Sequence, residues 1–195
     1  MSEKKNKKII IFSSGNGTNA EEIIKYFENK KEVNIHLVLT NNSNAGVLER
    51  AKKHKIPAIF YNNEAFEKKI VFEILNFLNP DLIVLAGFLR KIPDIIISKF
   101  PNKIINIHPA LLPSHGGKGM YGNKVHKSVI RSNDSKTGIT IHFVNGDYDK
   151  GEIILQKSIN VESKDSPESL FKRVQKLEHK FYPLIIEKLL DEQSW

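Results

Sequence analysis

The chain has 195 residues, of which 40% are hydrophobic, and this length and composition fit one domain with a sizeable buried core. It has no cysteine, which excludes disulfides, thiolate nucleophiles and cysteine-bound metals. The formal net charge of +8 comes from scattered lysines, without the arginine-rich or aromatic-interleaved segments of nucleic-acid binders. The polar opening and the short apolar run after it argue against a signal peptide or a membrane span.

Strands and helices are expected to alternate through the first half of the chain. Runs rich in β-branched and apolar residues predict strands at 8–13, 33–39, 58–61, 82–86 and 103–107. Helical spacing predicts helices beginning near Thr18 and at 45–53, 64–78 and 94–99. Parallel neighbours need a crossover between them, so this order predicts an α/β protein with a Rossmann-like, mostly parallel twisted sheet flanked by helices. Such sheets bind ligands at the carboxyl ends of their strands.

The second half of the chain changes character. Alternating segments at 138–144 and 152–159, joined by a turn at 145–151, predict an antiparallel strand pair. Residues 167–190 predict a long C-terminal helix whose inward positions are Leu170, Val174, Leu177, Phe181 and Ile185. We therefore expect a single cytoplasmic domain over 1–195, with residues 1–7 flexible.

The segment SGNGTN at 14–19 lies between a predicted strand and a predicted helix. Its glycines let the backbone approach an anion, and the helix N-terminus offers free N–H groups, so a phosphate is the expected guest. The segment also fits a loose dinucleotide fingerprint, which keeps a nicotinamide enzyme or a nucleotide-binding module as alternatives. Residues 40–42 are Thr-Asn-Asn and argue against the nicotinamide enzyme, because a dinucleotide ribose needs an acidic residue there. A turn that only requires positive φ is the remaining interpretation.

The strand ending in Asn106 and His108 carries the strongest chemical signal. Strand alternation sends both side chains to the same side, where an amide donor and a titratable imidazole fit acyl-type transfer. Asp149, in the turn at 145–151, could pair with His108 and raise its pKa, or could simply form the turn. The other histidines show no zinc spacing, and for His142 a packed structural role is favoured over a supporting contact with the residues of the site.

These motifs resemble the phosphoribosylglycinamide formyltransferases of purine biosynthesis. The resemblance runs from Ile10 to about Ile186 and rests on SGNGTN (14–19), PDLIVLAGFLRKI (80–92), INIHPALLPSHGGKGMYG (105–122), TGITIHFVNGDYDKG (137–151) and RVQKLEHKFYP (173–183). It implies an enzyme of IMP biosynthesis that moves the formyl group of 10-formyltetrahydrofolate to the amine of 5'-phosphoribosylglycinamide (GAR). The implied partners are these small molecules, with no metal, nucleic acid or membrane, for a monomer or a homodimer.

The resemblance also implies residue roles by position. Asn106 would hold the formyl oxygen, His108 would stabilise the oxyanion and donate a proton, and Asp149 would keep His108 charged and relay protons. The implied GAR-binding residues are Gly17, Thr18, Asn19, Gln175 and Glu178. The implied folate-binding residues are Leu89, Arg90, Lys91, Ile92, Asn106, Gly146, Asp147 and Tyr148.

Some features depart from the common pattern of the family. Lys150 replaces the glycine often found after the catalytic aspartate, and Leu89 stands where many relatives carry methionine. Residues 114–122 are longer and richer in glycine than in other subgroups, and we expect them to form a mobile flap without assigning individual roles. The catalytic trio also resembles methionyl-tRNA formyltransferase and formyltetrahydrofolate hydrolase, which carry an additional C-terminal or upstream domain. The hydrolase is the alternative function.

Overall fold

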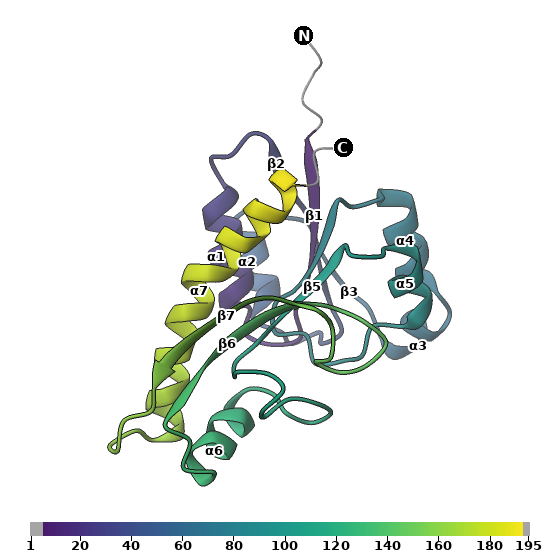
Figure 1. Ribbon diagram of the computed structural model, residues 1–195. Coiled ribbons are helices and arrows are strands. Elements are labelled where there is room, and N and C mark those ends of the chain that lie inside the picture. Colours follow the sequence, from purple (N-terminus) through teal and green to yellow (C-terminus); the bar gives the residue numbers. More distant parts are fainter. Residues whose placement is uncertain (1–5, 193–195) are drawn as a thin grey trace.

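The computed structural model describes residues 6–192, and its centre is a twisted mixed sheet (Figure 1). Within that range the sheet has seven strands in the order β3-β2-β1-β4-β5-β6-β7. The first five strands run parallel, whereas β6 pairs antiparallel with β5 and β7 pairs antiparallel with β6. The strands are β1 Lys7–Phe12, β2 Val33–Thr40, β3 Ala58–Phe60, β4 Leu82–Leu85, β5 Ile104–His108, β6 Lys136–Phe143 and β7 Ile153–Asn160. The predicted α/β fold class is confirmed.

Helices cover both faces of the sheet (Figure 1). One face carries α1 Thr18–Phe27, α2 Val47–Lys53 and α7 Pro167–Glu192, and the other carries α3 Asn63–Glu67, α4 Ile70–Leu78 and α5 Asp94–Lys99. A further helix, α6 Asn123–Arg131, packs against α7. Alternate residues of β1 enter the two cores, Ile9 and Ile11 on the α1 side and Ile10 and Phe12 on the α4 side. From Ile9 to Phe12, β1 is therefore fully buried on both faces.

The single helix predicted at 64–78 is wrong, because the chain breaks it into α3 and α4. Lys69 lies between them in the left-handed region with φ 62°, and the side chain of Asn62 caps α3 by accepting from Ala65 N at 2.9 Å. A continuous helix would turn Phe66 and Val71 about 140° apart. The break lets Phe66 stack on Tyr61 while Val71 is buried in the same core.

The C-terminal helix α7 follows the prediction in length but not fully in its inward face. Among the five predicted inward positions, Leu170 and Val174 are buried, whereas Leu177, Phe181 and Ile185 are only half-buried. The buried stripe instead continues in steps of four residues through Glu178, Tyr182, Ile186 and Leu190. The hydroxyl of Tyr182 donates to the carbonyls of Leu85 and Ile105 and so ties the helix to β4 and β5.

Three further expectations concern the start of the chain, the number of domains and membrane spans. Of the segment 1–7, residues 1–5 lie outside the described residues, and Lys7 is the first residue of β1. The division into a single domain stays a prediction. Along residues 6–192, none of the helices has the length and apolar character that crossing a membrane requires.

Candidate active site

A cavity of about 730 Å³ opens at the carboxyl ends of β1, β4 and β5, the edge where α/β sheets bind ligands. Its walls come from the glycine loop (residues 14–19), the segment 85–92, the end of β5, part of the flap (residues 114–122), the turn at 145–149 and α7. Every residue predicted for the site lines this cavity except Gly146, which lies in the same turn. Segments far apart in the sequence therefore meet at one place.

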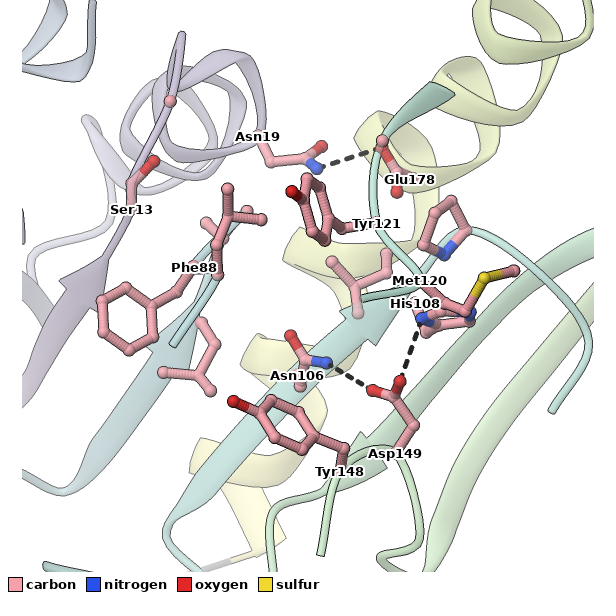
Figure 2. Close-up of a pocket in the computed structure, with 18 of the residues that line it drawn as sticks. Ser13, Asn19, Phe88, Asn106, His108, Met120, Tyr121, Tyr148, Asp149 and Glu178 are labelled. Carbon is pink, nitrogen blue, oxygen red and sulfur yellow. Dashed lines mark hydrogen bonds and ion pairs between the residues drawn. The ribbon is translucent and has the colours of Figure 1, made fainter. Parts of the chain in front are cut away.

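Asn106, His108 and Asp149 face one another at the centre of the cavity (Figure 2). The Nδ1 atom of His108 lies 3.5 Å from Oδ2 of Asp149, and Nδ2 of Asn106 donates to Oδ1 of Asp149 over 3.5 Å. Both contacts are long for hydrogen bonds, so both side chains can turn towards a bound molecule. His108 is 3% exposed, so its ring titrates in a largely dry environment.

The position of the proton on His108 follows from its partner on the other ring nitrogen. Nε2 lies 2.8 Å from the carbonyl oxygen of His115, which can only accept, so Nε2 carries a hydrogen. In the neutral ring Nδ1 is then bare and faces the carboxylate of Asp149. A second proton on Nδ1 would convert this contact into a charge-assisted hydrogen bond.

The ionisation of the pair is governed first by burial. Burial lowers the pKa of His108 below its usual value, and this outweighs the carboxylate of Asp149 and the carbonyl of His115, which both raise it. The expectation that Asp149 would raise the pKa of His108 is therefore correct for that interaction and wrong for the net direction. Burial would raise the pKa of Asp149, but contacts with His142, His108 and the N–H of Gly117 leave that pKa lowered.

A tight turn presents Asp149 to the cavity. Asn145 braces it by accepting from Asp147 N at 3.0 Å and donating to the carbonyl of Lys150 at 3.1 Å. A Cβ at Gly151 would lie 1.7 Å from the carbonyl oxygen of Phe143, so only glycine fits there. Asp149 itself adopts a left-handed φ of 55°. The strand ends thus fix the backbone that aims the carboxylate.

The glycine loop and α7 form one end of the cavity. Gly17 has φ 76° and caps α1 without a side-chain hydrogen bond, which leaves the helix N-terminus open to an anion. Gln175 donates to Oγ1 of Thr18 at 3.1 Å, and Asn19 donates to Oε2 of Glu178 at 3.0 Å. Burial raises the pKa of Glu178 to about 7, with Asn19 opposing the shift. These five residues, predicted together for one ligand, do meet.

The opposite end of the cavity is formed by residues 89–92 and by the turn at 145–149. Ile92 is buried, whereas Leu89 and Tyr148 are among the exposed large apolar side chains of the described chain. The backbone N–H of Leu89 donates to Oγ of Ser14 at 3.1 Å, and that hydroxyl donates to Asn41 at 2.7 Å. The polar pair Asn41 and Asn42, which argued against a dinucleotide, thus braces the glycine loop instead.

Sequence reasoning missed three groups at the centre of the site. His142 Nδ1 donates to the carbonyl of Phe143, and its Nε2 lies 3.2 Å from Nδ2 of Asn106 and 3.6 Å from Oδ1 of Asp149. Its alternation with Thr140 was the available signal, but the packed structural role was favoured. The flap adds two backbone groups, the carbonyl of His115 and the N–H of Gly117, which donates to Asp149 at 2.8 Å.

Between residues 6 and 192, no group of three or more histidines and acidic residues is placed to hold a metal ion. The expected absence of a metal stays a prediction, as do the roles of the individual site residues.

Fold and site together define a class: an α/β enzyme with an amide, an imidazole and a carboxylate arranged for acyl-type transfer beside a glycine loop at a helix N-terminus. The chain belongs to the Formyl transferase family, which matches residues 7–186.

Relatives of known name agree with the family over nearly the whole chain. A phosphoribosylglycinamide formyltransferase of Bacillus subtilis is 37% identical over 94% of this chain and 95% of its own length. A chloroplastic one from Arabidopsis thaliana is 37% identical over 98% of this chain and 68% of its own. The crystal structure of the Anaplasma phagocytophilum enzyme of this name superposes with a TM-score of 0.88 at 30% identity, covering 97% of this chain and 89% of that one.

Proposed function

We propose that this chain is a phosphoribosylglycinamide formyltransferase of purine biosynthesis. It transfers the formyl group of 10-formyltetrahydrofolate to the amine of GAR and releases formyl-GAR and tetrahydrofolate. The observation that carries the proposal is the meeting of Asn106, His108 and Asp149 in one cavity, between the glycine loop and the end formed by residues 89–92 and 145–149. The family and its named relatives support it.

GAR binds at the end of the cavity formed by the glycine loop. The backbone N–H groups at the start of α1, at Gly17, Thr18 and Asn19, hold its phosphate. Gln175 and Glu178 project from α7 towards the ribose and glycinamide portion, which brings the amine to the central trio. The folate lies at the other end, along Leu89, Arg90, Lys91, Ile92 and Asn106 and along the turn that contains Gly146, Asp147 and Tyr148.

The reaction is an addition followed by an elimination. The amine nitrogen of GAR bonds to the formyl carbon, and the carbonyl electron pair moves to oxygen as an oxyanion. Asn106 donates to that oxygen, and His108 stabilises it and acts as proton donor. The bond from carbon to N10 of the folate then breaks, N10 takes a proton, and Asp149 relays the proton that the amine loses.

The lowered pKa of His108 suits this sequence of events. Burial favours the neutral ring in the free site. A developing negative charge on the substrate, added to the carboxylate of Asp149, favours the imidazolium. His108 therefore becomes positively charged as the oxyanion forms. At that point its charge stabilises the transition state more than the ground state.

A coupled assay tests the proposal directly. Purified protein is incubated with GAR and 10-formyltetrahydrofolate while the folate absorbance is followed; the expected result is tetrahydrofolate formation that depends on GAR. His108→Ala should lower turnover by about 100-fold or more. Formate release without GAR would instead identify a formyltetrahydrofolate hydrolase, and wild-type turnover in His108→Ala would reject the mechanism.

Two accompanying expectations remain part of the proposal. We infer that the protein works as a monomer or a homodimer, which sedimentation at assay concentration measures. We also infer that it works in the cytoplasm, although a plant relative is named chloroplastic. Fractionation of the source cells tests the compartment.

A further inference from the structure

The flap reaches the catalytic pair through its backbone. The carbonyl of His115 accepts from Nε2 of His108 at 2.8 Å, and two residues later the N–H of Gly117 donates to Oδ2 of Asp149 at 2.8 Å. Both members of the pair are therefore oriented by the same short stretch of chain. The position of that stretch decides where their protons lie.

The flap is held in place by the side chain of His115. Its Nε2 lies 2.7 Å from Oδ2 of Asp134, which follows α6, and its Nδ1 lies 2.9 Å from Oγ of Ser128 on α6. A carboxylate can only accept, so Nε2 carries the hydrogen, and in the neutral ring Nδ1 accepts from the serine hydroxyl. The His115 side chain is 11% exposed, so this anchor is largely shielded from water.

The backbone at His115 adopts a conformation that is uncommon for a residue with a Cβ. Its φ of 56° lies in the left-handed region, which costs free energy for a residue with a Cβ. This conformation turns the carbonyl towards His108 while the ring points towards α6. Serine, histidine and aspartate also form nucleophilic triads, but neither Ser128 nor Asp134 lines the cavity.

We propose that His115 is a positioning residue, anchored by Asp134 and Ser128, whose carbonyl keeps a hydrogen on Nε2 of His108 and leaves Nδ1 facing Asp149. The inference rests on the proposed function and assigns a role to a flap residue that lies outside the central trio. Without the anchor the carbonyl of His115 moves away from His108, and the neutral ring can hold its hydrogen on either nitrogen. A smaller fraction of the enzyme then has the tautomer that the reaction needs.

The proposal predicts a change in pH dependence with a definite sign. Four titratable groups face His108: Asp149 from the turn, His142 from β6, His115 from the flap and His126 from α6. The carbonyl of His115 raises the pKa of His108 against the larger lowering by burial, and the His115 ring lowers that pKa by less than the carbonyl raises it. Loss of that carbonyl therefore lowers the pKa further, and the alkaline limb of kcat moves to lower pH.

The test compares His115→Phe and Asp134→Asn with the wild type. His115→Phe keeps a ring and removes both anchoring hydrogen bonds, while Asp134→Asn keeps the shape and removes the charge. For His115→Phe we expect kcat to fall about tenfold, with both KM values within about twofold, and the alkaline limb to move down. Asp134→Asn should show a smaller change in the same direction, and the double variant should be no worse than His115→Phe.

His54→Phe is the matched control. His54 also pairs with a carboxylate, Glu21, at 3.4 Å and is also 11% exposed, but it lies at the end of α2. Glu21 keeps Arg50 and Lys53 as partners when His54 is replaced. His54→Phe should lose about as much thermal stability as His115→Phe, but its kcat should keep the alkaline limb of the wild type.

NMR of isotope-labelled histidine nitrogens separates this proposal from the proposed function. The His108 signals, assigned with His108→Ala, should report hydrogen on Nε2 in the wild type and a mixture of tautomers in His115→Phe. This readout needs no turnover, so an inactive wild type would sink the proposed function and leave the tautomer test standing. An unchanged His108 tautomer in His115→Phe, or an unmoved pH limb in an active enzyme, would overturn the role of His115.

Discussion

Replacing Asp149 by asparagine removes one charge from the centre of the site and keeps the shape of the side chain. The carboxylate lies 3.5 Å from Nδ1 of His108. At this distance two unit charges interact by about 5 kcal/mol at an effective dielectric constant of about 20. The asparagine oxygen still accepts hydrogen bonds, so we take about half of this value, about 2–3 kcal/mol. That corresponds to a loss of about 30- to 160-fold in kcat.

The GAR-dependent assay over a range of pH values checks this prediction. Without the carboxylate, the pKa of His108 loses the interaction that most opposes the effect of burial. The protonated ring then becomes rarer as pH rises, so Asp149→Asn should be most impaired at alkaline pH and least impaired at acid pH. KM for GAR should change little, because the GAR end of the cavity is unaltered. An equal loss of kcat at every pH would refute the idea that Asp149 acts through the charge of His108.

Three further substitutions probe the cavity walls. Gly17→Ala would place a Cβ 2.6 Å from the Cβ of Val47 at a φ of 76°, so a lower Tm and a several-fold higher KM for GAR are expected. The pKa of His126 is lowered to about 4, mainly by burial. Its neutral form stabilises the fold above about pH 6.5, and up to about 3 kcal/mol is lost as pH falls towards 4; urea unfolding should show this loss vanish in His126→Leu. For Glu178, whose pKa is raised from 4.5 to about 7, the free energy of unfolding falls as pH rises from about 4.5 to about 7, and the full loss is present above pH 7. Glu178→Gln should therefore be more stable than the wild type above pH 7, as measured by denaturation, and should bind GAR more weakly, as measured by KM. Unchanged stability or an unchanged KM for GAR would contradict this prediction.

The sheet and the central trio were predictable because each depends on a short-range pattern. The apolar runs and glycine turns define the parallel strands, and the alternation of β5 puts Asn106 and His108 on one side. The position of Asp149 follows less directly, because β6 runs antiparallel to β5 and ends opposite Ile105, near the start of β5, so the turn after β6 must bring the carboxylate back to His108. Local spacing thus located the chemistry.

Other features depend on contacts that no local pattern contains. The carbonyl of His115 and the N–H of Gly117 act through the backbone, so side-chain chemistry could not identify them. The net direction of the His108 pKa required its burial, which follows only from the packed flap and β6. The break between α3 and α4 is imposed by the packing of Phe66 on Tyr61, two residues whose contact the helical periodicity ignores.

The buried stripe of α7 links the stability of the fold to the site. Its steps of four residues pass through Leu170, Val174, Glu178 and Tyr182, so an ionisable group occupies a position where an apolar residue would pack. The neighbouring Tyr182 ties the helix to the ends of β4 and β5, next to Asn106. The helix therefore cannot shift to give Glu178 more water without moving the strand ends that carry the trio. An acidic residue held in that stripe at a cost in stability is what a substrate-binding role for Glu178 requires, and a purely structural role would favour an apolar residue there.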